Sequence, residues 1–257
     1  MRSRKFWRHL RKKCITPEER FMGVIYFWLE EIKMEQKKRL DVKTITVLAI
    51  LSAIAYILAS LIRIPLVPGP VNLGYEPKDV ILVIAGFIYG PFAPLAMAAV
   101  ISLIEGFTTS VLGPIGIPMN FIASVAFGCT ASAFYKKWHT LTGAVVGLSV
   151  SVVLTTIVML LWNYALTPIL MGWPRDRVEA LLVPLFLPFN LIKGTLNATL
   201  LILLYKPIRI ALDKSRMLPA SLEADAKPAK INTGVLLVSA FILITCIVVV
   251  LSWQGVI

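Results

Sequence analysis

The chain has few charged residues, cysteines and histidines. Only 16% of its 257 residues are charged, against roughly 25% in a typical soluble domain. With the apolar composition described below, this excludes a disordered chain, a coiled coil and almost any soluble enzyme. The cysteines, Cys14, Cys129 and Cys246, are far apart and lack a CxxC or Cys/His spacing. Neither a structural zinc site nor a disulfide framework is therefore predicted.

Motifs of nucleotide-binding and catalytic sites are also missing from the sequence. There is no GxxxxGK[ST] segment, which excludes ATP binding through a P-loop. There is no HExxH, no GxSxG and no pair of carboxylates within the apolar runs, and His9 and His139 are not placed for a metal site. An enzyme acting within a membrane needs a nucleophile, base or metal set. The sequence therefore predicts that the protein is not an enzyme.

Apolar residues are abundant and occur in long runs. They make up 58% of the chain, and the mean hydropathy is +0.80. The runs are 44–62, 80–104, 118–135, 141–162, 181–205 and 233–253. A membrane-spanning helix needs about 20 apolar residues. The sequence therefore predicts an all-α, polytopic membrane helix bundle.

The excess of basic residues indicates how the spans are oriented. The chain has 26 Lys and Arg against 14 Asp and Glu. In a soluble protein this excess would suggest a nucleic-acid partner, but here the basic residues lie between apolar runs, as the positive-inside rule describes. If 80–104 is one span, they divide 15 to 10 across the membrane, whereas a reversal at Gly90-Pro91 divides them 21 inside to 4 outside. The rule favours the reversal, with helices at 74–89 and 91–112.

The resulting prediction is seven spans with a cytoplasmic N-terminus. The loops 63–78, 113–117 and 163–180 face outward, and the loop 136–140 and the segment 206–231 face inward. The domain organisation is a basic cytoplasmic N-terminal extension (1–43), a six-helix membrane core (44–213), a cytoplasmic linker (214–232) and an additional helix with a short tail (233–257). Within the extension, Phe21–Leu29 is predicted as an interfacial helix. A signal-peptide-like region and a translation start at Met34 are the alternatives.

Lys193 is a basic residue that this topology places on neither surface. It lies 13 residues from Lys206, which is about 20 Å along a helix and too far for its side chain to reach the interface. Ionisable groups at such depth usually have a function. Asn190, Lys193 and Asn197 share one helical face, which suits a ligand with carbonyl or anionic edges. For Asn197, a hydrogen bond between helices is an equal alternative.

Other polar residues near the outer side are also candidates. Asn163 ends the run 141–162, and its neighbours Trp162 and Tyr164 belong either to an aromatic belt or to the walls of a ligand site. For Glu105, an interfacial position or a structural ion pair is favoured over substrate contact. Pro184 and Pro188 are expected to break the helix before Lys193. Tyr75, Trp173 and the cluster Glu76, Lys78 and Asp79 are expected in outer loops that can close over the site.

Several local patterns resemble one transporter family. They are Ala49–Ala53 in the first run, Asp79-Val, Gly90-Pro91, Gly113-Pro114 before Asn120–Ala123, Asn163-Tyr164 and, most specifically, Leu187-Pro-Phe-Asn-Leu-Ile-Lys-Gly194. From about residue 44 to 213 the chain resembles the substrate-binding S components of energy-coupling factor (ECF) vitamin transporters, and most of all the riboflavin-specific members. The outer segment Tyr75–Lys78 and Glu105 do not match the riboflavin pattern.

The resemblance implies a six-helix core in the cell membrane that captures riboflavin from outside and binds no cofactor. It implies that Asn163, Asn190 and Lys193 contact the flavin, and Trp162, Tyr164, Trp173, Phe186 and Phe189 are candidates for the walls on which the ring stacks. It also implies a T component carrying two ATP-binding subunits, which docks on Ala49 and Ala53. Two alternatives remain open. One is an S component for another vitamin or an anionic metabolite, and the other is a membrane scaffold without transport.

Overall fold

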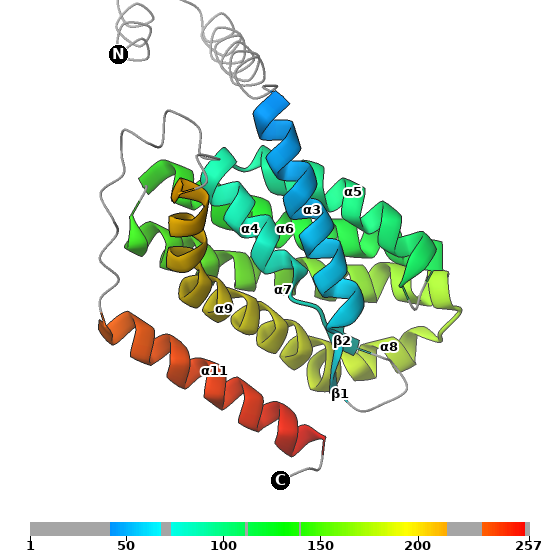
Figure 1. Ribbon diagram of the computed structural model, residues 1–257. Coiled ribbons are helices and arrows are strands. Elements are labelled where there is room, and N and C mark those ends of the chain that lie inside the picture. The colour runs from blue at the N-terminus through cyan, green and yellow to red at the C-terminus, as the bar shows by residue number, and fades with distance from the viewer. Residues whose placement is uncertain (1–41, 68–72, 111–112, 139, 215–232, 255–257) are drawn as a thin grey trace, which may run out of the picture. The chain divides into compact units, whose positions relative to one another are not determined.

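The computed structural model describes residues 42–67, 73–110, 113–138, 140–214 and 233–254, which form helices and one short β-hairpin (Figure 1). The elements are α3 (Val42–Leu61), β1 (Ile64–Val67), β2 (Leu73–Tyr75), α4 (Lys78–Tyr89), α5 (Phe92–Thr108), a 3-10 turn (Gly113–Ile115), α6 (Gly116–Trp138), α7 (Leu141–Met171), α8 (Arg175–Leu181), a π-helical stretch (Leu182–Phe186), α9 (Leu187–Lys214) and α11 (Thr233–Trp253). The predicted extension, linker and tail lie mostly outside the described residues.

Long apolar helices dominate the described part of the chain. There, four helical segments are long and apolar enough to cross a membrane: Val42–Leu61, Gly113–Trp138, Thr142–Met171 and Arg175–Leu204. Phe92–Thr108 and Leu237–Trp253 are apolar but shorter. The prediction of an all-α membrane helix bundle is confirmed, and α3, α4, α5, α6, α7, α9 and α11 follow the order of the predicted spans.

The reversal at Gly90-Pro91 is confirmed. α4 ends at Tyr89 and α5 begins at Phe92. Gly90 has a φ of 87°, in the region that favours glycine, and its N–H donates to the Gly86 carbonyl. Pro91 follows with no N–H to continue the helix. The run 80–104 therefore folds as two helices, as the charge distribution indicated.

α4 is the most enclosed helix of the described core. Residues 78–87 are all buried, although the helix has only 12 residues and a length of about 18 Å. Its apolar residues pack on α6, α7 and α9 in one cluster and on α3 and α5 in another. A helix that is apolar all round is stable inside a bundle. Neighbouring helices therefore shield this short helix.

The segment between α3 and α4 differs from the expected outer loop. β1 and β2 pair antiparallel, with Ile64 opposite Tyr75 and Pro65 opposite Gly74. α4 begins at Lys78, four residues later than predicted. The apolar pattern in this segment is too short to distinguish a strand from a loop. A hairpin of this size is also stable only when it packs on other elements, and the local sequence does not show such packing.

The predicted ends of two helices were wrong. α7 continues through Asn163 to Met171 with Pro168 inside it, and α8 also lies within the predicted loop 163–180. Asn163 does not end the helix because its amide bonds within α7, as described below. Pro184 and Pro188 do not break the chain's helical path, since the backbone widens into a π-helical stretch and α9 continues from Leu187.

The additional helix α11 packs on the hairpin and on α9 (Figure 1). Val250 is buried in a cluster with Leu66, Val67 and Tyr75, and Gln254 Nε2 donates to the Pro65 carbonyl. Its other face is apolar and exposed, as for Phe241 and Ile244. This face suits contact with lipid.

Candidate ligand-binding site

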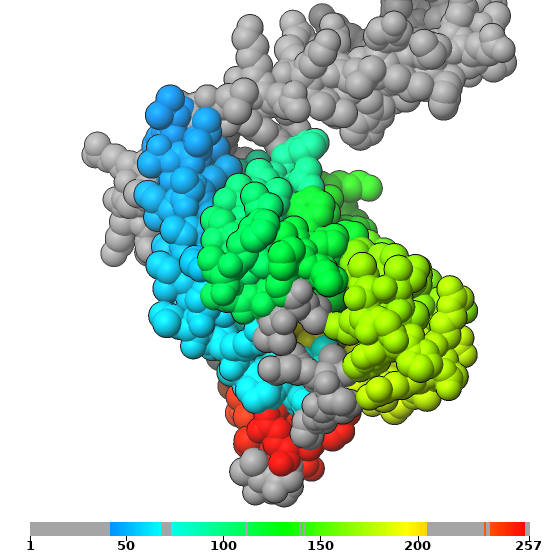
Figure 2. All heavy atoms as spheres, turned by 90° about the vertical axis from the view of Figure 1, so that its right-hand side faces the viewer, coloured from blue at the N-terminus to red at the C-terminus, as the bar shows by residue number. Residues whose placement is uncertain are grey.

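A cavity lies among the hairpin, α4, α5, α6, α7 and α9. Figure 2 views the face where the hairpin (cyan), α5 and α6 (green) and the end of α7 with α8 (yellow-green) come together around a hollow. The lining includes polar or charged side chains from α4, α5, α6, α7 and α9 and from the residues that flank the hairpin. It also includes aromatic side chains. Its charged lining residues are Arg63, Glu76, Asp79, Glu105 and Lys193.

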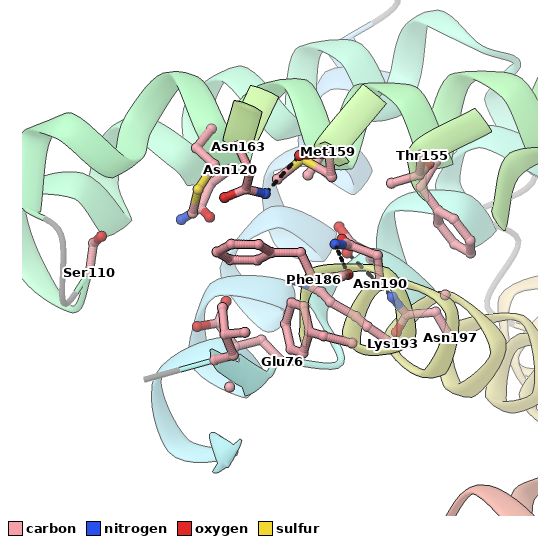
Figure 3. A pocket seen from close by; sticks show the side chains of 18 of the residues that line it. Glu76, Ser110, Asn120, Thr155, Met159, Asn163, Phe186, Asn190, Lys193 and Asn197 are labelled. Carbon is pink, nitrogen blue, oxygen red and sulfur yellow. Dashed lines mark hydrogen bonds between the residues drawn. The ribbon is translucent and has the colours of Figure 1, made fainter. Parts of the chain in front are cut away.

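α9 contributes one polar face to this cavity. Asn190, Lys193 and Asn197 all line it, as their helical spacing predicted (Figure 3). Gly194 lies on the same face, where a Cβ atom would come within 3.0 Å of Val152 on α7. The close contact of α7 and α9 therefore brings Asn163 of α7 to the same cavity.

The amides of Asn163 and Asn190 are held by backbone carbonyl groups one helical turn earlier in the chain. Asn163 Nδ2 donates to the Met159 carbonyl at 2.7 Å, and its Oδ1 accepts from Thr167 Oγ1 at 3.1 Å. Asn190 Nδ2 donates to the Phe186 carbonyl at 2.7 Å. An amide nitrogen has two donor hydrogens, so each keeps one for a further partner. Both residues are buried and yet retain hydrogen-bonding capacity toward the cavity.

Lys193 is the least constrained of these residues. Its side chain is partly buried, and in the described part of the chain no hydrogen bond or ion pair fixes its ammonium group. It acts electrostatically on Glu76 across the cavity. The ammonium is therefore positioned to donate to a ligand oxygen.

The aromatic wall differs from the predicted one. Trp173, Phe186 and Phe189 line the cavity, together with Phe127. Trp162 and Tyr164 are not among the lining residues, because each is rotated about 100° around the helix from Asn163. Tyr164 is 42% exposed, and the Arg175 guanidinium lies 6.0 Å from its ring centroid.

A buried ion network joins the hairpin side to α5. Lys78 Nζ pairs with Glu105 Oε2 and lies 3.2 Å from Glu76 Oε2. Arg63 Nη1 is 3.8 Å from Glu76 Oε1. Lys78 and Glu105 are each 2% exposed. Of the alternatives for Glu105, the structural pair is observed, although this residue also lines the cavity.

A second polar network fixes α4 against α6 and α9. Asp79 Oδ1 accepts from Ser124 Oγ at 2.6 Å, and Asp79 Oδ2 accepts from Asn197 Nδ2 at 3.3 Å. Tyr75 Oη donates to Asn197 Oδ1 at 2.9 Å. Asn197 therefore makes the hydrogen bond between helices that was one of its two interpretations. Lys78 and Asp79 lie buried in the first turn of α4, so they do not form part of a closing loop.

Two groups of the hairpin side have shifted pKa values. Burial raises the pKa of Tyr75, and the Asp79 carboxylate adds to this, so the phenol stays protonated as a donor. Burial by itself would raise the pKa of Glu76, but the Lys78 ammonium, followed by Lys193 and Arg63, outweighs it and lowers this pKa. The Glu76 carboxylate is therefore ionised at neutral pH.

Several lining residues were not singled out from the sequence. Asn120 and Met119 of α6 and Thr155 and Met159 of α7 belong to the lining. Asn120 belongs to the segment Asn120–Ala123, which contributed to the family resemblance. The composition of this segment does not indicate that Asn120 lines a cavity. Thr155 and Met159 are typical of a membrane helix, so only the packing of α7 on α9 assigns them to the cavity.

The cavity suits an uncharged organic ligand rather than a metal. In the residues that the structure describes, no group of three His, Cys, Asp or Glu is placed to hold a metal ion. Amide and ammonium donors beside aromatic side chains can bind a flat ring with carbonyl and N–H edges. The carboxylate and hydroxyl side chains on the α4 and α5 side of the cavity can bind hydroxyl groups of a ligand.

Comparisons with known proteins agree on one family. Residues 43–205 match a family model described as "ECF transporter, substrate-specific component". The chain is 32% identical over 182 residues to riboflavin transporter RibU of Staphylococcus aureus, covering 68% of this chain and 93% of that protein. It is 29% identical to riboflavin transporter FmnP of Bacillus subtilis, covering 69% and 97%. A solved structure, titled "Structure and mechanism of the S component of a bacterial ECF transporter", is 32% identical, covers 69% of this chain and 98% of that chain, and has a TM-score of 0.57.

Proposed function

We propose that this chain, which belongs to the family of substrate-specific components of ECF transporters, captures riboflavin. Two relatives with about 30% identity are named riboflavin transporters. The observation that carries the proposal is the convergence of Asn163, Asn190 and Lys193 on one cavity beside Phe186 and Phe189. The three polar residues were expected from the resemblance to contact a flavin.

The chemistry of these residues fits a flavin ring. Each asparagine can both donate and accept, which matches the alternating carbonyl and N–H groups of the ring edge. Lys193 supplies a charged donor for a ring carbonyl or a hydroxyl. Phe186 and Phe189 offer apolar faces on which the ring can stack. Trp162 and Tyr164 would then have no direct contact with the flavin in this arrangement.

We further propose that the chain works with a T component and two ATP-binding subunits in the cell membrane, with its N-terminus in the cytoplasm. Ala49 and Ala53 of α3 are exposed, whereas Ala55 and Ala59 are buried in the bundle. Small exposed residues let another helix approach closely. This face is therefore the proposed docking surface, and ATP hydrolysis in the partner subunits would drive release inside.

The first test is riboflavin binding by the purified chain in detergent, followed by quenching of flavin fluorescence. Lys193→Met is expected to weaken binding about tenfold or more, because a hydrogen bond from a charged donor is lost. Lys137→Met, at the exposed end of α6, is the matched control and should bind as the unaltered chain does. If the unaltered chain binds no riboflavin, the substrate is wrong, and thermal stabilisation by other vitamins identifies it. Equal affinity of both variants would overturn the role of Lys193.

A further inference from the structure

Among the residues that the structure describes, Glu105 uses only one of its two carboxylate oxygens. Oε2 accepts from Lys78 Nζ and, at 3.4 Å, from Asn120 Nδ2. Oε1 is buried and has no hydrogen-bond partner among the described residues. The residue is 2% exposed and lines the cavity. A buried charged oxygen without a partner is unfavourable, so its position beside the cavity indicates a donor from the ligand.

The charges around the cavity favour a neutral partner for this oxygen. Glu76, Asp79 and Glu105 stand against three basic groups, Arg63, Lys78 and Lys193. Lys78 is already shared between two of the carboxylates. Acidic and basic groups are thus equal in number, so the donor that meets Glu105 is expected to be a neutral N–H or O–H group, because it leaves this balance unchanged.

The surroundings of Glu105 favour hydroxyl groups. Thr109 and Ser110, which directly follow α5, line the same part of the cavity, and Asn120 stands beside the carboxylate. Figure 3 shows Ser110 on one side of the Phe186 ring and Asn190 and Lys193 on the other. Asn190 and Lys193 thus lie on the other side of the Phe186 ring from Ser110, which follows the helix that carries Glu105.

We propose that Glu105 Oε1 accepts a hydrogen bond from a hydroxyl of the flavin's polyol chain and so determines the preference for riboflavin over flavins without this chain. The inference rests on the proposed function, because it names the part of riboflavin that this wall of the cavity binds. It makes Glu105 both the ion-pair partner of Lys78 and a ligand-contacting residue. A purely structural Glu105 would not distinguish between flavins.

The test compares riboflavin with lumiflavin, which has the same ring but a methyl group in place of the polyol. In Glu105→Gln the charged acceptor is replaced by a neutral amide of the same shape. Riboflavin affinity is expected to fall about tenfold, while lumiflavin affinity stays within about twofold, because only riboflavin has the hydroxyl donor. An equal change for both flavins, or no change for either, would overturn the proposal.

Asp79→Asn is the matched control. Asp79 is also a buried carboxylate on the cavity, but Ser124 and Asn197 already occupy its two oxygens. This variant should change the affinities for riboflavin and lumiflavin by the same factor. A selective loss of riboflavin binding in Asp79→Asn but not in Glu105→Gln would assign the polyol contact to Asp79 and overturn the proposal.

A second measurement on the unaltered chain applies if Glu105→Gln does not fold. Riboflavin analogues in which each polyol hydroxyl is replaced in turn by hydrogen are compared for binding. At least one is expected to bind about tenfold more weakly. If none does, the proposal is overturned while flavin capture stands. If the unaltered chain binds neither riboflavin nor lumiflavin, the proposed function itself has failed.

Discussion

The polar side chains on the two sides of the cavity differ in how they are paired. On the α4 and α5 side, Lys78 and Asp79 bond to residues of other elements. On the α7 and α9 side, the bonds of Asn163 and Asn190 in the described residues go to partners four positions away along the chain, and Lys193 has no fixed partner there. Polar groups buried in a membrane bundle therefore include some that join helices and others that remain available to a ligand.

The largest expected effect follows from removing Lys78. In Lys78→Met, Glu76 and Glu105 lose the ammonium that both contact, and Glu105 stays buried without a counter-charge. Breaking a buried ion pair from one side costs about 3–5 kcal/mol, so the unfolding free energy in detergent should fall by that order. The double variant Lys78→Met/Glu105→Met should recover a large part of the loss. An unfolding free energy equal to that of the unaltered chain would contradict the structural role of the pair.

Two asparagines on the same face of α9 should respond in opposite ways. Asn197→Leu removes the hydrogen bonds to Asp79 and Tyr75, and the unfolding free energy should fall by about 1–3 kcal/mol, because buried partners are left unpaired. Asn190→Leu removes only the bond to the Phe186 carbonyl one helical turn earlier, so it should unfold nearly as the unaltered chain does but bind riboflavin about tenfold more weakly. Unfolding and fluorescence titration of both variants measure this. The same loss of stability in both would contradict the distinction between polar groups that join helices and those that remain available to a ligand.

A smaller effect is expected from the aromatic side chains. Phe186→Leu should weaken riboflavin binding about threefold to tenfold, because stacking of aromatic rings contributes about 0.5–1.5 kcal/mol. Trp162→Leu should leave the affinity within about twofold, since Trp162 does not line the cavity. The reverse result in fluorescence titrations would return Trp162 to the flavin site, as the sequence pattern suggested.

The smallest expected effect concerns acid. The pKa of Glu76 lies below its ordinary value of 4.5 in the folded chain. Its ionised form therefore contributes stability that is fully present above about pH 4.5 and is lost as the pH falls through the folded pKa. Thermal unfolding between pH 6 and pH 3 should show a smaller acid-dependent loss in Glu76→Gln than in the unaltered chain. Glu179→Gln, at an exposed position on α8, is the control, and an equal loss in both variants would contradict the assignment.

The sequence predicted the helices better than their ends. Long apolar runs and the distribution of basic residues were sufficient for the order of the spans and for the reversal at Gly90-Pro91. The continuation of α7 beyond Asn163 was missed because a polar residue resembles a helix end, although its side chain bonds back to the Met159 carbonyl. The hairpin was missed because its two strands depend on packing against α9 and α11.

The cavity was predicted in part. Asn190 and Lys193 follow from helical spacing and from the cost of placing an ammonium group deep in a membrane, which are properties of the chain alone. Whether a residue next to Asn163 faces a ligand depends on the rotation of α7, and the local sequence does not determine this. Trp162 and Tyr164 are absent from the lining of the cavity for that reason, and their contact with a ligand stays a prediction.

By itself the sequence determined an all-helical membrane bundle, the order of its helices and one polar face on α9, because hydropathy, charge and helical periodicity act locally along the chain. Only the tertiary structure decided which buried polar groups are partners of each other. Lys78 and Glu105 are 27 residues apart, and Asp79 and Asn197 are 118 residues apart. Such pairs exist only when the packed helices bring them into contact. The Glu105 oxygen that has no partner in the described part of the chain results from that same packing, because Lys78 and Asn120 both bond to the other oxygen.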